Sequence, residues 1–387
     1  MDCKQKRMGL VGCFGQIENI KRQSLFTLSI ANGDIVYGQK LDLRNLSQKA
    51  LSLGAYGAAT YLLYADYLNN PEGFNDHEAT AMLLVGIDEY SKAESLLRVI
   101  YENKNIKELS DSLRYFYYTC QAYIDHHNND NINALNNIAK VESSLELTEL
   151  KADCLVDLGL FNQAIEVYSS LFEDLDESYV NCQIGECYRK CGDYSTAIDY
   201  FTRAKQGSPN WAFPYYGIGW SYELSGDDDT ALKYYNEGLS VDQSYAYLFL
   251  QRGELYDKIG NKEKAAKDFN AVLALDKTIE DGTCRQYALF FLGRNTDALD
   301  WMNRVIEFQP NNAGHYYDKA CLCCRIGLYD EAIKAIEYAF KNGYRQFAHL
   351  NADDDIDPIK SIPAYRELYD KYYAIYQGEL EQLKDIL

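Results

Sequence analysis

The sequence predicts an all-α fold, a solenoid of stacked antiparallel helix pairs, and three observations lead to this prediction. The stretch from Ser178 to Lys277 repeats at a period of 34 residues. Within each period, apolar residues recur three and four positions apart, as they do on one face of a helix. A glycine separates the two helical patterns of each period and marks a turn. The matching positions are Gly185, Gly219 and Gly253; Tyr188, Tyr222 and Tyr256; Gly192, Gly226 and Gly260; Ala197, Ala231 and Ala265; and Phe201, Tyr235 and Phe269.

In the unit from Ser178 to Trp211, the first helix places Gly185 and Tyr188 on one face, and Gly192 ends it. The second helix presents Ala197, Phe201 and Ala204. Small residues let the two helices approach closely, and the aromatic residue fills the space between them. Neither helix can bury its apolar face alone, so neighbouring units must stack.

The pattern of Gly, Tyr, Ala and Phe at these offsets resembles the tetratricopeptide repeat, and Pro209 falls where that family places its proline. The resemblance implies a right-handed superhelix whose first helices line a concave groove. The run from Asp353 to Pro358 is similar to the acidic segment that follows the last repeat in many bacterial members of this family.

Extending the register divides the chain into four parts. Residues 144–343 form an array of about six clear repeats, with further turns at Gly159, Gly293 and Gly327. Residues 40–143 form divergent repeats, whose boundaries the pattern defines less sharply. Residues 1–39 form an N-terminal cap, and residues 344–387 form an acidic linker and a capping helix. Three weaker second helices are expected in the divergent part, at Ala59 and Leu63, at Ala93, Leu97 and Ile100, and at Ala134 and Ile138.

Two ends of the array allow more than one interpretation. Alternating apolar residues around Asn32 and Gly33 are compatible with a short β-hairpin, which either caps the first repeat or binds a partner. Near the other end, Ser361 to Leu387 has helical apolar spacing, which Gly378 could divide. Four carboxylates between Asp353 and Asp357 could bind Ca²⁺, but they lack the spacing of an EF-hand loop, which favours a charge cluster at a helix terminus.

Composition limits the partners. The net charge of −20 has the wrong sign for a nucleic-acid or anionic-membrane surface and favours basic or neutral partners. The chain lacks a run of about 20 apolar residues, so we expect a soluble protein without a transmembrane helix. Leu10 to Cys13 resembles a lipid-attachment site, but the preceding apolar stretch is too short for a signal. Eleven cysteines without a signal favour a cytoplasmic protein with reduced thiols.

The residues typical of enzyme sites do not form a convincing site. Cys321, Cys323 and Cys324 lie inside one predicted first helix, as do Cys182, Cys187 and Cys191, and this spacing favours core cysteines over a zinc site. Gly217 and Gly219 have the spacing of a nucleotide motif, but they belong to a repeat helix. We therefore expect no catalytic residue, no metal and no cofactor.

The first helices carry a stripe of aromatic and acidic residues that faces the predicted groove. Such aromatic residues are typical anchors for peptides, and the acids would attract Lys or Arg in a bound segment. Packing between neighbouring first helices is the alternative explanation for the stripe. The candidate partner-binding residues are Tyr179, Glu186, Phe213, Tyr216, Trp220, Glu223, Tyr247, Glu254, Asp257, Tyr287 and Tyr317.

The sequence thus predicts a non-enzymatic scaffold or adaptor that holds an extended or helical segment of another protein, with basic and apolar character, in its concave groove. A homo-oligomeric assembly protein is one alternative, and self-association would give a mass above 44.3 kDa. An enzyme with a hidden metal or thiol site is the other.

Overall fold

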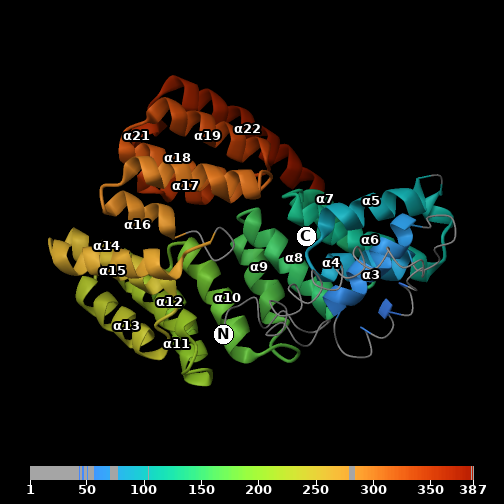
Figure 1. The fold of residues 1–387 in the computed structure, drawn as a ribbon, viewed down its shortest axis with the longest axis horizontal. Helices are drawn as coiled ribbons and strands as arrows, with labels where there is room; N and C mark the ends of the chain where they lie inside the picture. The colour runs from blue at the N-terminus through green and yellow to red at the C-terminus, as the bar shows by residue number, and fades with distance from the viewer. Residues whose placement is uncertain are drawn as a thin grey trace, which may run out of the picture. The chain divides into compact units, whose positions relative to one another are not determined.

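A computed structural model describes residues 56–69, 77–102, 104–278, 284–384 and 386, together with residues 43, 46, 47 and 50. Over these residues the secondary structure is helical and contains no strand, which confirms the all-α prediction (Figure 1). The suggested hairpin around Asn32 lies outside the described residues. None of the described helices is long and apolar enough to cross a membrane.

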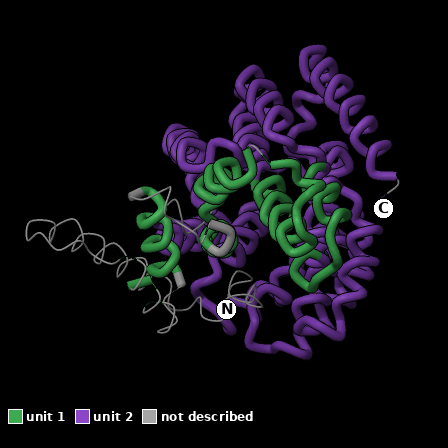
Figure 2. Tube along the Cα trace, turned by 90° about the vertical axis from the view of Figure 1, so that its right-hand side faces the viewer, with its two compact units in different colours: residues 1–127, 133–147 green, residues 128–132, 148–387 purple. Residues whose placement is uncertain are grey.

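The chain divides into two compact units (Figure 2). Unit 1 comprises residues 1–127 and 133–147, and unit 2 comprises residues 128–132 and 148–387. The boundary falls within the helix that begins the array of clear repeats.

Unit 1 contains stacked helices with a common core. Its helices are α3 (Tyr56–Asn69), α4 (His77–Gly86), α5 (Tyr90–Tyr101), η5 (Ile106–Glu108), α6 (Asp111–His127) and α7 (Asn131–Ile138), of which α7 begins in the short piece that groups with unit 2. Ala93, Leu97 and Ile100 of α5 pack with Leu84 of α4 and Ile124 of α6. α5 thus supplies the apolar side chains that its sequence spacing predicts.

In unit 2, consecutive helices form antiparallel pairs, which stack along the chain from α8 to α19 (Figure 1). The pairs are α8 (Leu145–Asp157) with α9 (Phe161–Ser169), α10 (Glu177–Lys190) with α11 (Tyr194–Gly207), α12 (Ala212–Leu224) with α13 (Asp228–Val241), α14 (Ala246–Lys258) with α15 (Lys262–Leu275), α16 (Arg285–Phe291) with α17 (Asn295–Phe308), and α18 (Ala313–Ile326) with α19 (Tyr329–Lys341). In each pair, the glycine between the two helices has a positive φ, from 73° at Gly159 to 91° at Gly327. A left-handed backbone there ends the first helix and lets the chain reverse, which accounts for the repeating glycine.

Close contacts between glycine and aromatic rings hold the stacked helices together. Phe201 of α11 is fully buried between Gly185 of α10 and Gly217 of α12. A Cβ atom would lie 3.1 Å from this ring at Gly185 and 2.6 Å from it at Gly217. Gly219, on the opposite side of α12, faces the ring of Tyr235 on α13. The two glycines with the spacing of a nucleotide motif therefore serve helix packing.

The pair of α16 and α17 departs from this arrangement. In the register that places Gly253 opposite Phe269, Gln286 lies opposite Met302. The glycine found at this position in α10, α12 and α14 is thus replaced by the longer glutamine, and the aromatic residue by the more flexible methionine. Gln286 is fully buried, and neither its amide nitrogen nor its oxygen has a hydrogen-bond partner. A buried polar group without partners costs free energy. At 7 residues α16 is also the shortest first helix of the six pairs from α8 to α19.

We expect Gln286→Met to raise the free energy of unfolding of unit 2 by about 1 kcal/mol, because it removes an unpaired buried amide at nearly constant volume. Urea unfolding followed by tryptophan fluorescence checks this, since all three tryptophans lie in unit 2. A loss of stability would mean that the amide has a partner in solution.

A pair whose first helix is broken completes unit 2. Its first part is α20 (Phe347–Ala352), η6 (Asp354–Ile356) and α21 (Asp357–Lys360), and its second is α22 (Pro363–Leu383). α22 continues through Gly378 without a break. The Tyr376 hydroxyl on α22 donates a hydrogen bond of 2.7 Å to the carbonyl oxygen of Leu158, so the last helix contacts the turn of the first pair in this unit.

Candidate functional site

The candidate site is the inner face of unit 2, which we define as the side of α10, α12, α14, α16 and α18 that carries Glu186, Trp220, Glu254, Tyr287 and Cys321. These five residues occupy equivalent positions of successive repeats. The spacing of turns and helices therefore brings them to one side of the stacked array, as Cβ atoms at equivalent helical positions point the same way.

The predicted aromatic residues differ in exposure. Tyr179, Tyr216 and Tyr317 are buried, with 6%, 6% and 5% of their surface exposed, respectively. Phe213, Trp220 and Tyr287 are half-buried, whereas Tyr247 is 38% exposed. Much of the aromatic stripe is thus occupied by packing within the array, and Tyr247 offers the most open ring of the set.

Tyr216 is the centre of an aromatic cluster on α12. Its ring centroid lies 5.4 Å from that of Trp220, 6.1 Å from that of Phe213 and 5.9 Å from that of Tyr247 on α14. Such offset and edge contacts favour aromatic association. The cluster therefore gives α12 and α14 a stable apolar surface with Tyr247 at its open edge.

An ion pair covers one side of this cluster. The Arg189 guanidinium makes two hydrogen bonds to the Glu186 carboxylate, of 3.1 and 2.6 Å, and lies 3.6 Å from the Trp220 ring centroid. Burial raises the pKa of Glu186 and Arg189 lowers it, and the net direction is downward. Arg189 therefore compensates the negative charge of Glu186. The same guanidinium covers the face of the Trp220 ring in a cation–π contact.

The negative charges of the other acidic residues in the stripe are compensated less completely by nearby cations. Glu223 accepts a 2.6 Å hydrogen bond from the Tyr235 hydroxyl, and burial raises its pKa. Burial also raises the pKa of Glu254 to about 7, because Arg325 at 3.7 Å compensates it only in part. Asp257 forms an ion pair of 2.6 Å with Lys262, whose side chain is mostly exposed.

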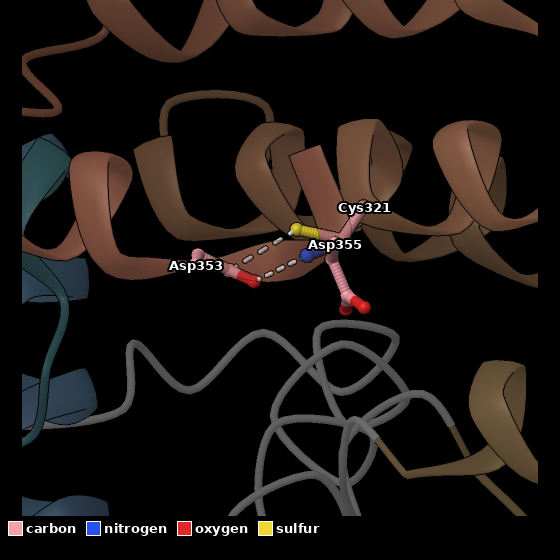
Figure 3. A group of neighbouring side chains, drawn as sticks. All are labelled: Cys321, Asp353 and Asp355. Carbon is pink, nitrogen blue, oxygen red and sulfur yellow. Dashed lines mark hydrogen bonds between the residues drawn. The ribbon is translucent and has the colours of Figure 1, made fainter. Parts of the chain in front are cut away.

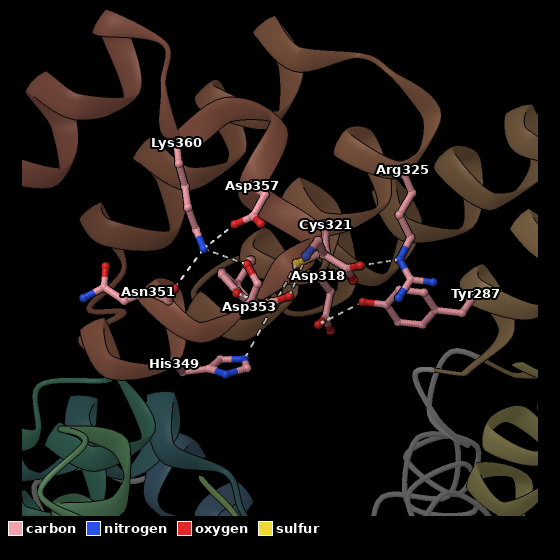
Figure 4. A network of polar contacts seen from close by, with 11 residues as sticks. Tyr287, Asp318, Cys321, Arg325, His349, Asn351, Asp353, Asp357 and Lys360 are labelled. Carbon is pink, nitrogen blue, oxygen red and sulfur yellow. Dashed lines mark hydrogen bonds and ion pairs between the residues drawn. The ribbon is translucent and has the colours of Figure 1, made fainter. Parts of the chain in front are cut away.

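A polar network extends this face toward the end of the array (Figure 4). The Tyr287 hydroxyl donates a 3.3 Å hydrogen bond to Asp318, whose pKa burial raises to about 7. Arg325 donates from Nε to Asp355, at 2.9 Å. The Tyr317 hydroxyl donates to Asp353, at 2.5 Å, and Lys360 donates to the backbone carbonyl of the same residue, at 2.9 Å.

Cys321, Asp353 and Asp355 lie close enough to suggest a metal site, with potential ligand atoms within 4.8 Å of one another (Figure 3). Their chemistry does not fit one. The Cys321 thiol is 3.8 Å from Asp353, and burial raises its pKa well above the ordinary value, so it is protonated. Asp353 and Asp355 already accept hydrogen bonds from the backbone amide of Asp355, the Tyr317 hydroxyl and Arg325. The cluster is a hydrogen-bonded joint between α18 and η6.

His349 on α20 joins the polar network, with its Nε2 atom 3.7 Å from the Asp353 carboxylate, whereas the other cysteines and histidines that the structure describes lie outside it. Cys182 and Cys187 are buried, as are Cys323 and Cys324, whereas Cys191 is exposed. His126 and His127 lie in the last turn of α6, and the ring of His127 stacks on that of Tyr90 at 4.2 Å. The four buried thiols and the His127 ring therefore contribute to packing.

Sequence reasoning missed Asp318 and Arg325 as members of this face. Asp318 follows the stripe residue Tyr317 directly, and Arg325 lies beyond the last stripe position of its helix. The net charge of −20 shows that the chain has more acidic than basic residues. It does not show that Glu254 and Asp355, which lie in different helix pairs, share the Arg325 guanidinium. Only the spatial arrangement of the repeats brings them together.

Two family models described as tetratricopeptide repeat match the chain. One matches residues 183–209, and the other matches residues 214–245 and 246–279. These segments correspond to most of α10 through α15. No curated protein gives a significant match.

Several solved structures are similar to part of the chain. A crystal structure of MamA is 18% identical over 49% of this chain and 93% of its own, with a TM-score of 0.29. A thermophilic tetratricopeptide repeat protein of Thermus thermophilus is 20% identical over 49% of this chain and 100% of its own, with a TM-score of 0.39. MamA (41-end) from Desulfovibrio magneticus RS-1 is 16% identical over 42% and 96%, with a TM-score of 0.36.

The matched segments coincide with three consecutive helix pairs, each with the glycine turn and the glycine–aromatic contact that their sequence spacing predicts. Residues 183–209 and 214–279 are therefore tetratricopeptide repeats.

Proposed function

We propose that the chain is a non-enzymatic, cytoplasmic scaffold whose inner face in unit 2 binds an extended or helical segment of another protein. Tetratricopeptide repeats support a role as a protein-interaction scaffold in general. The proposal adds the surface that is used and the character of the segment, which carries basic and apolar side chains.

The observation that carries this proposal is the surplus of carboxyl groups on the inner face. Glu254 and Asp355 share the Arg325 guanidinium, and Asp318 has a hydroxyl rather than a cation as its hydrogen-bond partner. Burial raises the pKa of each of these three carboxyls, which means that their charges are poorly compensated. A Lys or Arg side chain from a partner would supply the missing positive charge.

The apolar part of the interaction rests on Tyr247. Its ring is the most exposed of the predicted anchors. It packs against the ring of Tyr216, which is buried and held in place by its neighbours. A rigid support reduces the entropy that a contact residue loses on binding. An apolar side chain placed beside the basic one would therefore find a prepared contact at α14.

Peptides of equal length test the proposal. We expect a Lys/Leu peptide to bind more tightly than Ser/Leu or Glu/Leu peptides in fluorescence anisotropy, with affinity that falls as salt rises. Glu223→Gln with Asp318→Asn should weaken Lys/Leu binding by about tenfold, since these amides keep the hydrogen bonds and lose the charges. Tyr247→Ala should weaken the binding of all three leucine-containing peptides.

The matched control is Glu263→Gln with Glu307→Gln, which removes two charges from exposed positions on the second helices α15 and α17. Equal losses in both double variants would show that net charge alone attracts the peptide. If the Glu/Leu peptide binds as well as the Lys/Leu peptide, the proposal for a basic segment is wrong. Variants that retain selectivity can then be used to capture the natural partner from an extract.

A further inference from the structure

Arg325 connects helices that are not neighbours in the array. It belongs to α18, yet its Nη1 atom lies 3.7 Å from the carboxylate of Glu254 on α14, and α16 comes between these helices in the chain. Its guanidinium lies 5.7 Å from the ring centroid of Tyr287 and 5.4 Å from that of Phe291, both on α16. At its other end it binds Asp355 of η6 (Figure 4). One side chain therefore spans four elements.

The connection lies where the array has its shortest first helix. α16 has 7 residues, whereas α14 has 13 and α18 has 14. Fewer turns give α16 less surface to bury against its neighbours, so the packing of α14, α16 and α18 depends more on side-chain ties.

The charges around Glu254 oppose its ionisation. Besides Arg325, it faces the like charges of Glu223 on α12 and Asp355 on η6. It also faces Tyr235 on α13 and Cys284 at the start of α16, which stay neutral because burial raises the pKa of both well above their ordinary values. The Arg325 charge is divided between two carboxylates, so it does not fully offset the burial of Glu254 and the like charges around it.

We propose that Glu254 is a proton switch on the packing of α14, α16 and α18: the arrangement in the structure is held best when Glu254 carries a proton and loosens when Glu254 ionises. The switch is a property of the free chain and does not depend on whether the inner face binds a partner.

The direction follows from proton linkage. In the packed arrangement, burial raises the pKa of Glu254 from its ordinary value of 4.5 to about 7. In a loosened arrangement, water would solvate the carboxylate and return the pKa toward the ordinary value. The packed state therefore binds more protons, so acid favours it and rising pH through this interval favours loosening. One proton changes the opening equilibrium by up to about tenfold per pH unit.

Hydrogen–deuterium exchange of the full chain at about pH 5.5, 6.5 and 7.5, corrected for intrinsic exchange rates, tests the switch. We expect protection of the peptides that cover α14, α16 and α18 to fall as pH rises, by up to about tenfold per pH unit. Peptides from α11 serve as an internal reference. Glu254→Gln should remove this pH dependence from the peptides of α14, whereas α18 also carries Asp318, a carboxyl whose pKa burial raises to about 7.

Asp257→Asn is the matched control, because it removes a carboxylate from the same helix whose partner, Lys262, is largely exposed. It should keep the pH dependence of the parent. Arg325→Met removes the opposing charge, which raises the pKa of Glu254 in the packed arrangement further, so the loss of protection should extend to higher pH than in the parent. The switch is excluded if Glu254→Gln and the parent show the same pH dependence, or if Asp257→Asn also abolishes it.

Discussion

Replacing Arg252 with methionine is expected to lower the free energy of unfolding of unit 2 by about 3–5 kcal/mol. Arg252 on α14 donates two hydrogen bonds of 2.7 Å to the Asp268 carboxylate on α15, and a third, of 2.6 Å, to the side-chain oxygen of Asn236 on α13. The guanidinium thus ties one helix pair internally and to the pair before it.

The size of the effect comes from the group that is left behind. Asp268 is buried, with 2% of its surface exposed, so without Arg252 its carboxylate has neither a counter-ion nor water. Methionine keeps much of the apolar stem of arginine, which separates the loss of charge from the loss of packing. Breaking one partner of a buried pair is much more costly than the net contribution of the intact pair.

The companion variants make the cause visible. Asp268→Asn should cost less, because the amide oxygen still accepts a hydrogen bond and Arg252 retains Asn236. Arg252→Met combined with Asp268→Leu should recover most of the loss, since no unpaired charge remains. The measurement is urea unfolding monitored by tryptophan fluorescence, which reports on unit 2. An additive double variant would show that the two side chains act independently.

The repeating part of the fold was predictable because it depends on contacts within one repeat and its neighbour. Glycine at the turn and the small residue opposite an aromatic ring have local steric causes, so they appear at fixed sequence offsets. The C-terminal pair was less predictable. Asp353 to Asp357 was recognisable as a charge cluster, but its role in breaking a first helix into α20, η6 and α21 depends on bonds from Tyr317, Arg325 and Lys360.

The position of the inner face was predictable, but the exposure of its individual side chains was not. The periodic stripe identified Glu254 and Tyr247, since a fixed helical register decides which side chains share a face. Whether a stripe residue is open or covered depends on neighbours that the register does not specify. Tyr216 is covered by Phe213, Trp220 and Tyr247, and the role of the stripe in partner binding remains a prediction.

Gly217→Ala is expected to destabilise unit 2 by about 1–3 kcal/mol, although alanine is the better helix former. A Cβ atom at this position of α12 would lie 2.6 Å from Phe201 Cε1 and 2.7 Å from Cδ1 and Cζ. These distances are too short for carbon atoms. The ring cannot move away easily, because it is fully buried and its other face meets Gly185.

Gly378→Ala separates steric conflict from helix propensity. Gly378 lies within α22 on an exposed position, and no heavy atom lies within 4 Å of a Cβ atom built there, so this variant should gain up to about 1 kcal/mol. The same substitution therefore has opposite signs in two helices of one unit. Phe201→Leu should reduce the cost of Gly217→Ala, because a smaller side chain leaves room for the new methyl group, whereas Phe201→Leu alone is destabilising. If Gly217→Ala is as stable as the parent in urea unfolding, the helices of neighbouring pairs can separate without loss, and the close contact of α11 with α12 does not determine the stability of the array.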